Sequence, residues 1–203
     1  MPDEIASAGP APAAGGLPSR WTRATVHPDL WVDEADDPRE SGPAGTDEHG
    51  VLADYLRRYR LTLELKCADL DAEQLARRSV PPSTMSLLGL VRHLAEVERT
   101  WFRGTLAGQD VGSLYCTPES PDEDFDGARA DDAVVAQAWA DWRAEVAFAE
   151  EVLARTEDLG ATVHRRGDPL PVRDVVVHLV EEYARHCGHA DLLRECVDGR
   201  IGQ

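Results

Sequence analysis

Residues 85–108 read MSLLGLVRHLAEVERTWFRGTLAG, and this stretch decides the fold class. Its apolar residues recur at steps of three and four, a spacing that places side chains on one face of an α-helix. These residues are Leu87, Leu90, Leu94, Val97 and Trp101. Prolines before the stretch and a glycine at its end bound the segment. We therefore expect an amphipathic helix with one buried face.

Three further stretches repeat this pattern. One begins at Thr46, a candidate helix cap, and one follows the acidic loop at residues 117–132. The last follows a polar turn at residues 164–171, with Pro171 at its first helical position, and runs to about Val197. Strand signals are nearly absent. Four long amphipathic helices predict an all-α protein organised as a four-helix bundle.

Length and charge limit the classes of function. With 203 residues the chain suits one domain of ordinary size plus a tail. The formal net charge is −17, from 21 Lys and Arg against 38 Asp and Glu. An acidic surface repels phosphates and anionic lipid headgroups, so we expect no nucleic-acid partner and no membrane partner.

The absence of recognisable targeting signals and the spacing of the cysteines favour a cytoplasmic protein with reduced thiols. The N-terminus has neither a basic region nor an apolar run, and no stretch of about 18 apolar residues occurs. We expect a soluble cytoplasmic protein. The four cysteines, of which Cys187 is one, show no C-x-x-C spacing and are expected to be reduced thiols.

Composition divides the chain into three parts. Residues 1–20 are rich in Ala, Gly and Pro without apolar periodicity, so we expect a disordered tail. Residues 21–45 carry Trp21 and Trp31 among turn residues and are interpreted as an extended arm whose indoles dock on the domain. Residues 46–203 are expected to form the helical domain.

A polar cluster interrupts the apolar face of the last helix. Glu182 and His186 are one turn apart and lie side by side, and His178 and His189 fall on the same face. A buried carboxylate beside imidazoles is costly without a partner, and a metal ion would supply one. His93, on the core face of the helix at residues 85–108, is the candidate third ligand. The alternative is that each histidine is an ordinary hydrogen-bonded core residue.

Two segments resemble the hallmark segments of a known superfamily. They are SVPPSTMSLLGLVRHLAEVERTWF and EEYARHCGHADLLRECVDG, and with the arm the resemblance covers residues 21–203. The chain is identified as similar to the DinB-like proteins, in the mini-circle branch. The resemblance implies an up-down-down-up four-helix bundle with long connections and a divalent metal on one histidine of helix two and two residues of helix four. His93 and His186 match the first and last ligands.

The remaining ligand position falls at Glu182. The commonest pattern in the superfamily has histidine there, whereas the branch resembling mycothiol-dependent maleylpyruvate isomerase has glutamate. A His, Glu, His set suits zinc first, or another divalent first-row metal. His189 is predicted to replace a ligand or to serve as a base behind the ligands, which makes it the candidate catalytic residue.

Four other residues near the candidate ligands have expected roles or positions. Arg185 and Asp191 are candidates for binding the thiol cofactor or for orienting ligands, with surface salt bridges as the alternative. Cys187 lies about 100° from the ligand face and is expected to pack beside the third helix. Glu96 is expected to be either solvated or in contact with the ligands.

These features support two classes of function. The first is a metal-dependent transferase that joins a mycothiol-type small thiol to an electrophile, as the resemblance implies, or a metal-dependent hydrolase or isomerase. The second is a metal-binding bundle without catalysis, active in stress response. Either form is expected to be able to form a homodimer. An open coordination position reaching solvent would favour the enzyme.

Overall fold

The structure is a computed structural model that describes residues 31–32, 34–42 and 45–202. The tail predicted at residues 1–20 and the indole of Trp21 lie outside the described residues. Trp31 is buried, and the Nζ atom of Lys66 lies 3.9 Å from the centroid of its ring. The described part of the arm therefore contacts the helical domain through Trp31.

Helices account for most of the described residues, as predicted. The four longest are α1 (Glu48–Cys67), α3 (Leu87–Glu98), α5 (Asp132–Arg155) and α6 (Val172–Asp198). Shorter helical elements are η1 (Glu34–Asp36), α2 (Ala72–Ala76), η2 (Arg99–Leu106) and α4 (Glu123–Asp126). Among the described residues, none of these helices has the length and apolar content needed to cross a bilayer.

Polar side chains and glycine set the ends of the long helices. Asp47, rather than the predicted Thr46, caps α1 by accepting the backbone N–H of Gly50 at 2.7 Å. Ser86 caps α3 in the same way. Gly199 ends α6 with a φ of 79°, a left-handed conformation that glycine adopts without steric cost.

The connection before α6 differs from the prediction. Residues 164–171, expected to be a polar turn, belong instead to an antiparallel hairpin of β1 (Thr162–Arg165) and β2 (Asp168–Pro171). Its turn residues Arg166 and Gly167 have φ values of 54° and 93°. Two-residue hairpin loops of the most favoured kind require such positive values, so the Arg-Gly pair closes the hairpin.

The helix predicted over residues 85–108 also changes its winding. It is an α-helix to Glu98 and continues as the π-helical segment η2, where the N–H of Ala107 donates to the carbonyl of Phe102, five residues earlier. Such wide turns are rare and frequently occur at functional sites. Here the segment carries Trp101.

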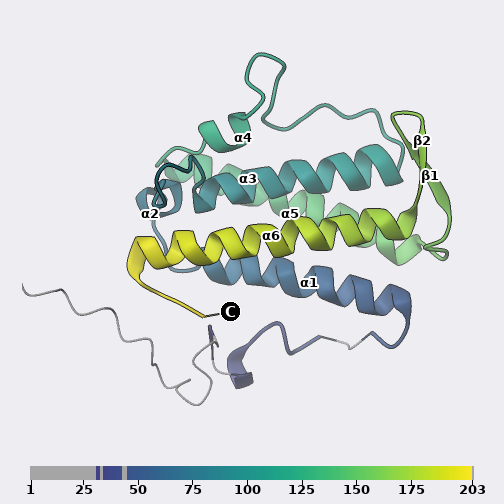
Figure 1. The fold of residues 1–203 in the computed structure, drawn as a ribbon, viewed down its shortest axis with the longest axis horizontal. Helices are drawn as coiled ribbons and strands as arrows, with labels where there is room; N and C mark the ends of the chain where they lie inside the picture. Colours follow the sequence, from purple (N-terminus) through teal and green to yellow (C-terminus); the bar gives the residue numbers. More distant parts are fainter. Residues whose placement is uncertain (1–30, 33, 43–44, 203) are drawn as a thin grey trace, which may run out of the picture.

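Contacts between side chains give the directions of the helices. Glu48 pairs with Arg173 near the starts of α1 and α6, and Lys66 pairs with Asp191 toward their ends. These two helices are therefore parallel. Figure 1 shows α1, α3 and α6 lying side by side with α5 behind them, the hairpin at one end and α4 beside α3.

The other two long helices run the opposite way. His93 of α3 faces Glu182, whereas Trp101, further along the same direction, meets His178, which precedes Glu182 in α6. Hence α3 is antiparallel to α6. Near the start of α1, a ring nitrogen of His49 lies 2.9 Å from the carbonyl oxygen of Leu153, near the end of α5. Further along α1, Glu64 pairs with Arg143, which lies earlier in α5, so α5 is antiparallel to α1.

One buried polar network joins all four long helices inside the apolar core. The carboxylate of Glu98 accepts two hydrogen bonds from Arg60 and one from the hydroxyl of Tyr183, each at 2.8 Å. Trp142 donates its indole N–H to the same hydroxyl. All four side chains are buried. Each helix contributes one member, so the network fixes the register between them.

Candidate metal centre

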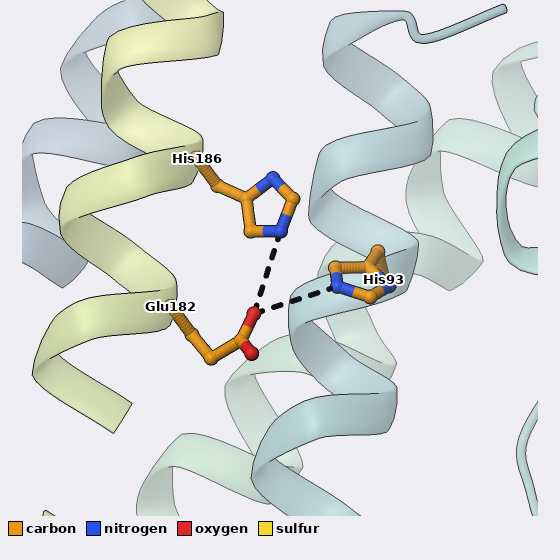
Figure 2. A group of neighbouring side chains, drawn as sticks. All are labelled: His93, Glu182 and His186. Carbon is orange, nitrogen blue, oxygen red and sulfur yellow. Dashed lines mark ion pairs between the residues drawn. The ribbon is translucent and has the colours of Figure 1, made fainter. Parts of the chain in front are cut away.

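Three predicted ligands meet between α3 and α6. Glu182 and His186 lie one turn apart on α6, and His93 approaches from α3 (Figure 2). His93 and Glu182 are partly buried and His186 is buried. The structure therefore brings together the His, Glu, His set expected from helical periodicity.

The distances between these side chains fit a shared cation better than direct hydrogen bonds. The Oε2 atom of Glu182 lies 3.5 Å from Nε2 of His186 and 3.8 Å from Nε2 of His93. Both distances exceed the hydrogen-bond range. Ligand atoms at about 2.1 Å from one tetrahedral ion lie about 3.4 Å apart. The three donor atoms lie within 4.8 Å of one another, so small movements of side chains would close the set around an ion.

Asp124 of α4 orients His93. Its Oδ2 atom lies 2.8 Å from Nδ1 of His93. Burial by itself raises the pKa of Asp124, but the hydrogen bond and charge of His93 outweigh burial and hold that pKa below its usual value. An ionised carboxylate only accepts, so Nδ1 of His93 carries the proton of this hydrogen bond, and Nε2 is the ring nitrogen that faces Glu182. A carboxylate behind a ligating histidine is the common arrangement in metal sites.

Asp124 was not predicted as a site residue. It is one of several acids in the loop at residues 117–132, and its spacing along the chain gives no signal that separates it from its neighbours. Only the packing of α4 against α3 brings it to His93.

His186 is supported on the side away from Glu182. Its Nδ1 atom lies 3.3 Å from Nδ1 of His189. Burial, with smaller contributions from His93 and His189, lowers the pKa of His186 to about 4. The imidazole is therefore neutral at pH 7, the form that ligates metals. His189 itself lies behind the ligand set, as one of its two predicted roles requires.

The two residues predicted to bind the thiol take different positions. Asp191 lies on the opposite side of α6 from Glu182, where it pairs with Lys66 at 2.7 Å. Arg185 is exposed, and its charge contributes to the low pKa of His186. The structure thus brings Arg185, but not Asp191, near the ligand set.

Glu96 holds the loop that covers one side of the site. It is buried, and its Oε1 atom accepts the backbone N–H groups of Tyr115 and Cys116 at 2.6 and 3.2 Å. This excludes the solvated position considered from the sequence. By these bonds Glu96 keeps Cys116 beside the site.

Cys187 is not where it was expected. It is buried, but its thiol lies 3.6 Å from the backbone carbonyl oxygen of Tyr59 in α1, not against the third long helix. The cause is the close packing of α6 along α1, which covers the side of α6 that bears Cys187.

Two pockets reach the candidate ligands. One, of about 380 Å³, is lined by His93 and Glu182 together with Trp101 and Arg165. The other, of about 480 Å³, shares His93 and reaches His186. A metal held here would therefore have open coordination positions beside space for small molecules, the arrangement of catalytic rather than structural sites.

Comparisons with known proteins concern the fold and the family of the chain. A crystal structure of a conserved protein of an Enterococcus faecalis locus is similar, with 15% sequence identity and a TM-score of 0.57, covering 76% of this chain and 99% of that one. At this identity the likeness concerns the fold alone. No curated protein matches the chain. The family model described as mycothiol-S-transferase matches residues 51–199, which include all three candidate ligands. The chain therefore belongs to the mycothiol-S-transferase family of DinB-like proteins.

Proposed function

We propose that this chain is a metal-dependent transferase that joins a mycothiol-type thiol to an electrophile. Membership of the family supports the thiol and the transfer chemistry. The observation that carries the metal is the meeting of His93, Glu182 and His186 beside two pockets. We further propose that residues 46–203 form an up-down-down-up four-helix bundle, which the parallel α1 and α6 and the antiparallel α3 support.

In this proposal the ligand set holds zinc. A zinc ion bound there would lower the pKa of a coordinated thiol and keep it ionised at neutral pH. Asp124 holds His93 with its Nε2 lone pair toward the site, and His189 does the same for His186 through Nδ1. His189 thereby acts as a positioning residue rather than as a base in contact with substrate.

A different histidine is placed to accept the thiol proton. His178 lines the smaller pocket, and its Nε2 atom lies 3.4 Å from Oε1 of Glu182. Its ring also packs on Trp101, with 4.4 Å between centroids. Within the proposed mechanism, His178 takes the proton while Trp101 shields the reacting atoms from water.

Metal content and turnover test the proposal together. Elemental mass spectrometry should find about one zinc per chain after reconstitution, with loss of zinc in His93→Ala and His186→Ala and weaker retention in Glu182→Ala. His164→Ala, which alters an exposed histidine of the hairpin, is the matched control. Mycothiol-dependent conversion of monochlorobimane should follow zinc content across these variants.

The outcomes separate the candidate functions. Zinc without thiol-dependent turnover would favour the non-enzymatic metal-binding protein, or a hydrolase or isomerase. If all three ligand variants retain full zinc, the ligand set is wrong.

A further inference from the structure

The hairpin places a cation in the pocket beside the candidate metal. Arg165, the last residue of β1, lines the 380 Å³ pocket together with His93 and Glu182. Its guanidinium carbon lies 3.8 Å from the centroid of the Trp101 ring. Trp101 in turn packs on His178, which neighbours Glu182. A continuous chain of contacts therefore connects Arg165 to the ligand set.

Arg165 differs from the other arginines in its partners. In the part of the chain that the structure describes, every other partly or fully buried arginine donates to a carboxylate or a carbonyl oxygen. Within the same described residues, Arg165 has no such acceptor, and its guanidinium lies over the ring of Trp101. Burial and the nearby Arg166 lower the pKa of Arg165, and no carboxylate raises it. The guanidinium nevertheless remains charged at neutral pH.

The acids of the same pocket are already engaged and do not neutralise Arg165. Glu96 accepts two backbone N–H groups, and Asp124 accepts from His93. Glu182 faces the histidines. The guanidinium thus lines the pocket without a hydrogen-bond acceptor from the residues that the structure describes.

The two pockets differ in whether a cation lines them. The larger one carries the carboxylates of Asp122 and Asp126 and is lined by no lysine or arginine among the described residues. The smaller one carries Arg165 beside the engaged carboxylates of Glu96, Asp124 and Glu182. Of the two, the smaller pocket is therefore the one with a cation that can pair directly with an anionic group. The planar guanidinium fork fits a carboxylate in particular, because it donates two parallel hydrogen bonds.

We infer that Arg165, held over the ring of Trp101, selects an electrophile that carries a carboxylate. This inference rests on the proposed transferase function and names its second substrate. The carboxylate is assigned to the electrophile because the cysteine of mycothiol is amide-linked at both its amino and carboxyl groups and offers no carboxylate. With an aryl chloride as electrophile, a sulfur–carbon bond forms, chloride leaves with the electrons of the broken bond, and the thiol proton passes to solvent through His178.

The test compares two probes that differ in one substituent, which is anionic in the first and neutral in the second. Chlorodinitrobenzoate, with chloride para to the carboxyl group, and its primary amide share the ring and the leaving group. With zinc-loaded protein and mycothiol, we expect kcat/KM to favour the carboxylate by about 10-fold or more. Arg165→Gln should lower this ratio about 10-fold, and Arg165→Lys should keep part of it.

A matched variant and a binding measurement separate the possible failures. Arg166→Gln changes the exposed neighbour in the same hairpin and should keep the wild-type ratio. Calorimetry with the unreactive dinitrobenzoate and dinitrobenzamide should give the same preference, lost in Arg165→Gln. If the two ligands bind equally, or the Gln variant keeps the preference, the inference is overturned. If the carboxylate binds preferentially but neither probe reacts, the proposed transferase fails while the carboxylate site remains.

Discussion

At the scale of single residues, His93 depends on contacts from two other elements. Its Nδ1 atom meets Asp124 of α4, and its Nε2 atom faces Glu182 of α6. Its ring also stacks on Phe125, with 5.0 Å between centroids. The orientation of this side chain is therefore set before any ion binds.

Removing the carboxylate behind His93 should weaken the metal site. We expect Asp124→Ala to lower zinc affinity about 10- to 100-fold, because His93 would lose the bond that fixes its tautomer and ring orientation. Competition with a chromogenic chelator measures the affinity. Asp122→Ala, two residues earlier and exposed, should bind zinc like the wild type. Equal affinity in both variants would mean that Asp124 does not orient His93.

The cysteines should differ strongly in reactivity. Burial raises the pKa values of Cys67 and Cys187 to about 12, so almost no thiolate is present at pH 8, whereas Cys196 is exposed. We expect a disulfide reagent to modify Cys196 rapidly in the native protein and to reach Cys67 and Cys187 only after unfolding. Mass spectrometry of digested protein locates the label. Rapid native labelling of Cys187 would contradict its packing against α1.

At the scale of elements, the buried network around Glu98 holds the four long helices together. We expect Glu98→Ala to lower the free energy of unfolding by about 3–5 kcal/mol, because the buried Arg60 would lose its buried counterion and keep only the exposed Glu150 at 3.9 Å. Urea unfolding monitored by circular dichroism measures the change. The exposed pair Glu151 and Arg155 provides the control, since Glu151→Ala should leave stability nearly unchanged. A small effect of Glu98→Ala would show that water or another group replaces the carboxylate.

The sequence predicted the long helices well and one connection badly. Periodic apolar residues with caps and terminal glycines bound α6, and α3 together with its continuation η2, within a few residues, since burying one face requires that spacing. The hairpin carries Pro169 and Pro171 in four-residue strands, too short for an alternating pattern to register. Its turn depends on a positive φ at Arg166, a conformation that an arginine in the sequence does not predict.

The candidate site was likewise predictable where its residues lie on long helices and not where they lie on connections. His93, Glu182 and His186 lie on long periodic helices, so the wheel positions and the family resemblance both pointed to them. Asp124 and Arg165 come from connecting segments, where three-dimensional proximity leaves no periodic trace in the sequence. The predicted environment of Cys187 was wrong for a related reason. A helical wheel gives the angle of a side chain but not which helix lies there.

At the scale of the whole molecule, a bound ion would join α3 to α6. We expect saturating zinc to raise the unfolding temperature by several degrees, since a ligand at about 100 times its Kd adds about 2.7 kcal/mol to stability. Scanning calorimetry with zinc, and with a chelator, measures the shift. His93→Ala should abolish it, whereas His164→Ala should keep it. A shift that persists in His93→Ala would place the stabilising ion elsewhere.

The position of the hairpin between α5 and α6 affects how related chains can diverge in sequence. It supplies Arg165 but no candidate ligand, and it begins and ends outside the helices that hold His93 and Glu182. Related chains could therefore exchange this connection, in length or in sequence, without disturbing the positions of His93, Glu182 and His186. Under the proposed function, new electrophiles would be acquired by replacing one loop, while the proposed ligand set stays as it is.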